Sequence, residues 1–119
     1  MSAVLPASDL RRARDYYERV VGVEVEDAPL LRGFMGHAGN GQRFLVYETT
    51  ASHGDATAAT FVVDDLETVM HELRDRGVVF EEYDLPGVKT VKGVLGMGPT
   101  GKSAWFKDSE GNTINVAQM

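Results

Sequence analysis

The sequence of 119 residues contains no cysteine, so disulfide bonds, thiolate metal ligands and a cysteine nucleophile are all excluded. Positive charge is also scarce: 12 lysines and arginines stand against 18 aspartates and glutamates, and the formal net charge is −6. This balance does not provide the basic surface that nucleic-acid binding requires. No apolar run reaches the length of a membrane span, and MSAVLPASDLRR has no signal-peptide pattern. We therefore expect a cytoplasmic protein that binds neither nucleic acid nor membrane.

A pattern that occurs once in each half of the chain predicts two similar helices. Each begins at an aspartate, Asp9 or Asp65, whose side chain can accept hydrogen bonds from free N–H groups of the first helical turn. Apolar residues then recur at helical spacing. Each helix is predicted to end at a glycine, Gly22 or Gly77, because glycine favours the left-handed conformation common after a helix.

Short strands and hairpins complete the repeat. A strand is predicted before each helix, a second strand after it, and then a hairpin that turns at Gly39-Asn40-Gly41 in the first half and at Gly111-Asn112 in the second. Each half is therefore predicted to fold as β-α-β-β-β. We expect one α+β domain over residues 1–119, with a first module of about residues 1–56 and a second of about 57–119.

The second half carries a glycine-rich insert, residues 84–102, that the first half lacks. Long loops in compact domains are often lids over a ligand site, so the insert is predicted to be a flap. A solvated surface loop is the alternative.

Three segments carry a resemblance to a known family: SDLRRARDYYERVVG, FVVDDLETVMHELRDRGVVFE and AWFKDSEGN. They resemble the vicinal oxygen chelate superfamily, which includes glyoxalases, bleomycin-resistance proteins and extradiol dioxygenases. The last segment is similar to the family's F-x-D-P-D-G-N turn, with Ser109 in place of proline and Glu110 in place of aspartate. The resemblance implies two βαβββ modules that form a curled mixed sheet around a cleft, with the helices outside, in a homodimer. It leaves the chemistry open, because this fold hosts many functions.

The resemblance also implies where a metal would bind. In the metal-dependent members, His, Gln or Glu side chains from the first and last strands of each half hold a divalent ion. The equivalent positions in this sequence fall near Ser2, Val46, Ala58 and Asn115. None of these side chains supplies the anionic or imidazole donors that hold a catalytic divalent ion. We therefore expect no metal and no other cofactor, with a divalent metal as the alternative.

Strand alternation predicts which side chains line the cleft. Successive side chains point to opposite faces, so each strand has a bulky set that should pack on the helices and a smaller, partly polar set that should face the cleft. In RFLVYE, Leu45 and Tyr47 are assigned to the helix side. For Trp105, alternation does not separate a core position from the cleft wall. The predicted cleft residues are Ser2, Phe44, Val46, Glu48, Ala58, Thr60, Trp105 and Asn115.

These features predict a protein that binds a small organic molecule in the cleft without catalytic metal, as a homodimer. The first alternative is an enzyme, a divergent lyase, isomerase or dioxygenase that uses a divalent metal or has Glu48 or His53 as its base. His53 is considered because its polar loop follows the strand that ends at Glu48. The second alternative is a dimeric accessory domain without a ligand. At the level of sequence these alternatives stay open.

Overall fold

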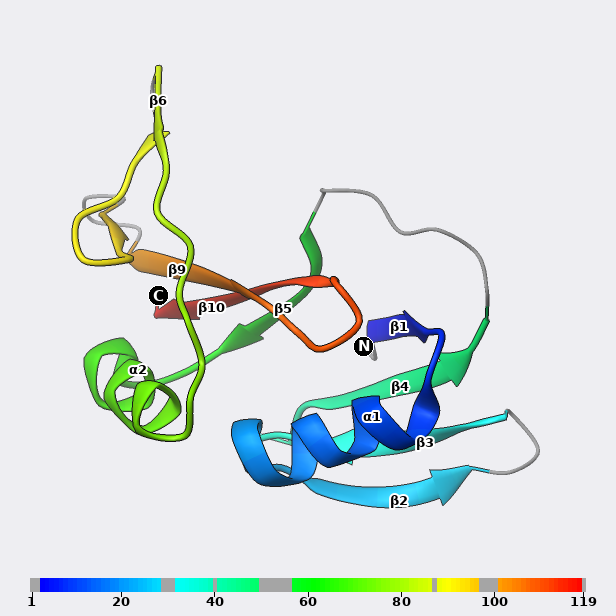
Figure 1. Cartoon of the computed structure of the whole chain (residues 1–119). Helices are drawn as coiled ribbons and strands as arrows, with labels where there is room; N and C mark the ends of the chain where they lie inside the picture. The colour runs from blue at the N-terminus through cyan, green and yellow to red at the C-terminus, as the bar shows by residue number, and fades with distance from the viewer. Residues whose placement is uncertain are drawn as a thin grey trace.

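The computed structural model of the chain describes residues 3–28, 32–39, 41–49, 57–86, 88–96 and 101–118 (Figure 1). The helical segments are α1 (Leu10–Asp15), its π-helical continuation η1 (Tyr16–Val21) and α2 (Leu66–Asp75). The strands are β1 (Ala3–Ala7), β2 (Glu24–Ala28), β3 (Gly33–His37), β4 (Arg43–Glu48), β5 (Thr57–Val62), β6 (Asp84–Leu85), β7 (Val88–Lys89), β8 (Leu95–Gly96), β9 (Lys102–Lys107) and β10 (Thr113–Gln118).

Two four-stranded sheets repeat the same topology. Sheet A has the order β1-β4-β3-β2, and sheet B has the order β5-β10-β9-β8. In each sheet the first and last strands of the half pair in parallel, and the remaining pairs are antiparallel. The α+β class and the two-module arrangement are thus confirmed. We call β1–β4 with α1 and η1 the first module, and β5–β10 with α2 the second; the predicted boundary near residue 56 lies outside the described residues.

The predicted helix ends are confirmed. The Asp9 side chain accepts a hydrogen bond from the backbone N–H of Arg12 at 3.0 Å, and the Asp65 side chain accepts one from Thr68 at 3.3 Å. These bonds satisfy N–H groups that have no partner within the first turn. At the other end of η1, Gly22 adopts a left-handed conformation with φ +83°.

One predicted strand is reduced to a single bridge. The segment VVFEEY after α2 contributes only an isolated antiparallel bridge between Phe80 and Phe106, with a further bond from Glu81 N–H to the Trp105 carbonyl at 2.7 Å. The edge of β9 is shared, because β8 pairs with Ser103 and Lys102 farther along the same strand. Two short elements therefore occupy the edge that one strand, β2, occupies in sheet A.

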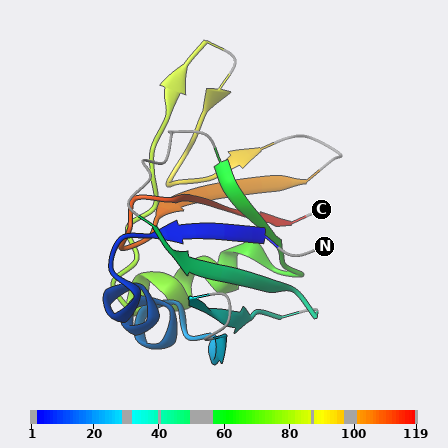
Figure 2. The same cartoon turned by 90° about the vertical axis from the view of Figure 1, so that its right-hand side faces the viewer.

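The insert contains the short hairpin β6–β7, whose register places Leu85 opposite Val88. It stands away from the two sheets as an arm (Figures 1 and 2). Leu85 is exposed. The role of this arm as a flap stays a prediction. No helix among the described residues is long and apolar enough to cross a membrane.

The helices cover one face of each sheet, and the buried side chains form one continuous cluster. In the first module, Tyr17 packs against Phe44 at a ring-centroid distance of 4.9 Å. Phe44 and Val46 are both 1% exposed. The predicted faces of β4 are therefore wrong: these two side chains lie on the helix side, and Leu45 and Tyr47 take the opposite face. Both sets on this strand are bulky, so size alone does not distinguish them.

The faces of β5 and β10 agree with prediction. Phe61, Ile114 and Val116 belong to the core cluster or pack against it. Thr60 is exposed on the alternate face of β5. On these strands the large apolar set and the small polar set differ clearly, and alternation assigns them without ambiguity.

Candidate functional site

The face of sheet B that points away from the core cluster carries a row of three predicted cleft residues. The register of β10 places Asn115 beside Thr60 of β5 on one side and beside Trp105 of β9 on the other. Their sequence neighbours Ala104, Phe106, Ile114 and Val116 are buried in the core. The structure thus brings Thr60, Asn115 and Trp105 together on what we call the open face of sheet B.

The row combines an aromatic surface with a fixed amide. Trp105 is half-buried, and its ring meets Tyr83 edge-to-face with a centroid distance of 5.7 Å. Asn115 is 7% exposed, and its Nδ2 donates a hydrogen bond to the Ala104 carbonyl at 3.0 Å. This bond fixes the orientation of the amide, while Trp105 and Tyr83 provide the rigid apolar area that small-molecule sites use.

The open face of sheet A is more apolar. The register aligns Leu45 of β4 with Val4 of β1 and Met35 of β3. Val4 is 54% exposed, and Leu45 and Met35 are half-buried. These residues take the place that the sequence assigned to Phe44 and Val46.

The remaining predicted site residues are not assembled in the described part of the chain. Glu48 lies at the end of β4 and is exposed. Ala58 belongs to β5, but its side chain is not described. Ser2 and His53 lie outside the described residues.

The described side chains do not fit a divalent metal ion. The described ranges contain no group of three or more His, Asp or Glu side chains that could hold a metal ion. At the positions the resemblance implies, Val46 is buried beneath a helix and Asn115 supplies a single amide. A stable site needs several converging donors, which these residues do not supply.

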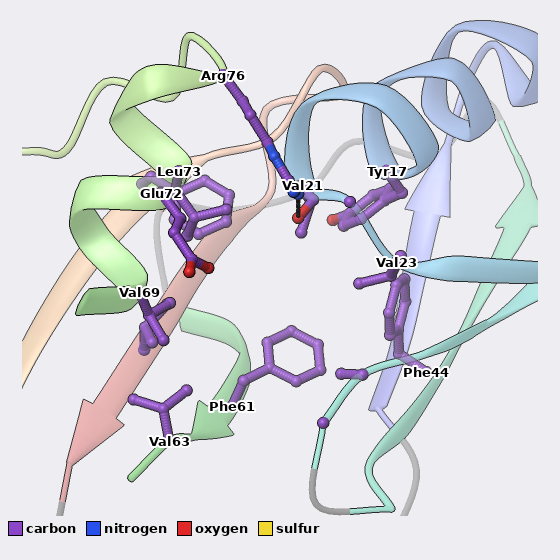
Figure 3. Close-up of a pocket in the computed structure, with 15 residues that line it drawn as sticks. Tyr17, Val21, Val23, Phe44, Phe61, Val63, Val69, Glu72, Leu73 and Arg76 are labelled. Atoms are coloured by element: carbon purple, nitrogen blue, oxygen red, sulfur yellow. Dashed lines mark hydrogen bonds between the residues drawn. The ribbon is translucent and has the colours of Figure 1, made fainter. Parts of the chain in front are cut away.

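A cavity of about 320 Å³ lies on the other side of sheet B, between α2 and η1 (Figure 3). Its walls are mostly apolar and include the rings of Tyr17, Phe44, Phe61 and Phe106. Phe44 and Phe61 meet across the two modules with a centroid distance of 5.3 Å. The cavity could not be predicted from the sequence, because each of these residues by itself has the pattern of an ordinary core residue.

The turn between β9 and β10 joins the second module to the start of the first helix. Glu110 accepts hydrogen bonds from the backbone N–H groups of Ser8 and Asp9, both at 3.1 Å, and from Arg12 Nε at 2.7 Å. The hydrogen bond from Arg12, with the backbone bond from Asp9, lowers the pKa of Glu110 to about 2, although burial opposes the shift. We call this set of contacts the Glu110 clamp.

Asp108 makes a second connection in the same turn. Its Oδ2 accepts hydrogen bonds from the hydroxyl of Tyr17 at 2.6 Å and from Asn112 Nδ2 at 2.9 Å. The Asn112 amide also donates to the Pro6 carbonyl at 2.9 Å. Burial, followed by the charge of Asp108, raises the pKa of Tyr17 well above its usual value. Tyr17 is therefore a neutral donor that ties the first helix to this turn.

The model of the Glyoxalase/Bleomycin resistance protein/Dioxygenase superfamily matches residues 2–116. The chain belongs to this superfamily, as the resemblance of its three segments implies. No curated protein sequence matches the chain.

Solved structures share the fold at low sequence identity. TnmS3, an antibiotic-binding protein from Streptomyces sp. CB03234, is 24% identical, with 97% of this chain and 90% of that chain covered and a TM-score of 0.68. A glyoxalase/bleomycin resistance protein from the same organism is 23% identical, with 99% and 100% covered and a TM-score of 0.71. Lactoylglutathione lyase from Agrobacterium tumefaciens is 18% identical, with 99% and 91% covered and a TM-score of 0.68.

Proposed function

We propose that this protein binds a small organic molecule on the open face of sheet B, as a cytoplasmic homodimer and without a catalytic metal. The observation that carries the proposal is the row Thr60–Asn115–Trp105 on a face that no helix covers among the described residues. An aromatic ring beside an oriented amide can hold a flat ligand by stacking and fix its orientation with a hydrogen bond.

The position of this row supports the proposal. Thr60 and Asn115 come from the first and last strands of the second module, which are the strands that line the cleft in the family that the sequence resembles. TnmS3, which has a similar fold, is described as an antibiotic-binding protein. Binding without turnover is therefore a function that this architecture can serve.

A second copy of the chain would complete the cleft. The open face of sheet A carries the apolar row of Val4, Leu45 and Met35, and exposed apolar area of this kind favours association. In the proposed dimer, sheet A of one copy lies opposite sheet B of the other. The arm formed by β6–β7 would then reach over the cleft as the flap that the sequence predicts.

The proposal is tested with a panel of aromatic antibiotics and aromatic metabolites. Because Trp105 is the sole tryptophan, its fluorescence reports directly on ligands that reach the open face of sheet B. We expect a bound ligand to quench this fluorescence and to raise the melting temperature, since it binds the folded state.

Two variants locate the site. Binding to the variants is measured by isothermal titration calorimetry, because Trp105→Ala lacks the fluorescent reporter. Trp105→Ala and Asn115→Ala should each weaken binding by about tenfold, the effect of losing a stacking or hydrogen-bonding contact. Val79→Ala, at a residue that is 82% exposed, serves as the control and should leave binding unchanged. A ligand that binds both site variants as tightly as the unmodified protein would contradict the placement. Tight stoichiometric metal with turnover would contradict binding without chemistry.

A further inference from the structure

We propose that the cavity between α2 and η1 is a second ligand site, separate from the open face of sheet B, and that it takes small organic amines with an aromatic or aliphatic body. The two sites lie on opposite sides of the same sheet. Phe106 and Val116 line the cavity, while their neighbours Trp105 and Asn115 occupy the open face. Binding at one site can therefore be distinguished from binding at the other.

The size and walls of the cavity suit the apolar part of such a ligand. Its volume of about 320 Å³ is at the small end of the range typical of small-molecule sites. The four aromatic rings, Tyr17, Phe44, Phe61 and Phe106, offer both apolar area and the electron-rich faces that attract cations.

Two charged side chains line the cavity, Glu72 of α2 and Arg76, the residue that follows the end of α2, and in the described part of the chain only the Arg76 side chain forms a hydrogen bond. Arg76 Nη1 donates a hydrogen bond to the Val21 carbonyl at 3.0 Å, at the C-terminal end of η1 (Figure 3). The carbonyl end of a helix carries partial negative charge, which offsets the guanidinium. Glu72, one helical turn earlier, has no hydrogen bond or ion pair with another residue in the described ranges.

The carboxylate of Glu72 determines which class of ligand the cavity favours. Figure 3 shows the Glu72 side chain directed into the space between α2 and η1, next to apolar walls. A carboxylate in this position favours a ligand that brings a positive charge and N–H donors, which an ammonium group supplies. The net charge of −6 favours the approach of cations as well. The geometry thus points to an ammonium group at Glu72 with its organic body in the cavity.

The test uses three ligands with the same ring and different charge: tryptamine, the uncharged tryptophol and the anionic indoleacetate. Each is titrated at millimolar concentration into the full chain while the valine methyl resonances and the backbone amide resonances are followed by NMR. We expect tryptamine to shift the resonances of Val21, Val63 and Val69, which line the cavity. Tryptophol and indoleacetate should bind at least about fivefold more weakly, because they lack the charge-assisted hydrogen bond.

The variant Glu72→Gln removes the charge and keeps the size of the side chain. It should weaken tryptamine binding by about tenfold and leave tryptophol binding unchanged. Glu67→Gln is the matched control, because Glu67 lies on the same helix but pairs weakly with Lys102 at 3.5 Å and does not line the cavity. Both positions are exposed, so both variants should fold, which the NMR spectrum verifies.

Three results would overturn the amine site. One is the absence of shifts at the cavity valines with millimolar tryptamine. Another is equal affinity for tryptamine in Glu72→Gln and in the unmodified protein. The third is shifts confined to the open face, at Thr60 and Trp105. This last result would leave the function proposed for that face intact and reject only the cavity site.

Discussion

Replacement of Glu110 by glutamine would test whether the Glu110 clamp holds the two modules together. The Glu110 side chain is 1% exposed. Its carboxylate accepts hydrogen bonds from Arg12 and from two backbone N–H groups at the start of α1. Glutamine keeps the size of the side chain but loses the charge. Its amide can direct only one oxygen at these donors, and its NH₂ group would face Arg12.

The size of the expected stability loss follows from the lowered pKa of Glu110. A shift from 4.5 to about 2 corresponds to about 3 kcal/mol of stability at pH 7, and because Arg12 is 54% exposed we expect a loss of about 2 kcal/mol in Glu110→Gln. The pKa is lower in the folded state, so this contribution is fully present above the ordinary value of 4.5 and is lost as the pH falls toward 2. The difference between the two proteins should therefore shrink by roughly half between pH 7 and pH 3.

Urea unfolding followed by circular dichroism at several pH values between 7 and 3 measures the stability loss at pH 7 and its decrease toward pH 3. Glu67→Gln is a suitable control, since its ion pair with Lys102 is exposed and should change stability by less than about 0.5 kcal/mol. A Glu110→Gln protein that is as stable as the unmodified one at pH 7 would contradict the stabilising role of the Glu110 clamp. A stability difference that stays constant down to pH 3 would contradict the contribution of the lowered pKa of Glu110.

Two further predictions concern other contacts between the modules. Tyr17→Phe removes the hydroxyl that donates to Asp108 and should cost about 1 to 3 kcal/mol, measured by urea unfolding, because a buried carboxylate loses a donor. A finding of unchanged stability would show that this bond contributes little. Gly22→Ala should cost more than Gly77→Ala, measured by thermal unfolding. Both glycines have positive φ, but only at Gly22 would the added Cβ also meet the guanidinium of Arg76, which would have to move away from its hydrogen bond with the Val21 carbonyl. Equal losses in the two variants would contradict the close approach of Arg76.

Local signals in the sequence were sufficient for much of the fold. Aspartates at helix starts and glycines after helix ends act within a few residues of their own position, so Asp9, Asp65 and Gly22 could be assigned without knowledge of the tertiary structure. The same holds for the faces of β5 and β10. There, large apolar residues alternate with small polar ones, and a period of two identifies the buried side.

Features that depend on contacts between distant segments could not be predicted in this way. On β4 both faces carry bulky side chains, and Phe44 is buried because Tyr17 of the helix packs on it. The cavity is formed by residues of both modules, and its carboxylate, Glu72, lies on an exposed part of α2 where a solvated glutamate is the ordinary expectation. Glu110 is recognisable as part of a family turn, but nothing in the turn itself indicates that it bonds to Ser8.

The Glu110 clamp also bears on the order of events during synthesis. Ser8 and Glu110 are 102 positions apart in a chain of 119 residues. The first helix therefore leaves the ribosome long before the carboxylate that completes its N-terminal hydrogen bonds. Contacts between distant segments form late, since the intervening chain must be closed into a loop first. We expect the nascent first module to stay only partly ordered until the last hairpin has emerged, and the whole chain then to fold in a single cooperative step.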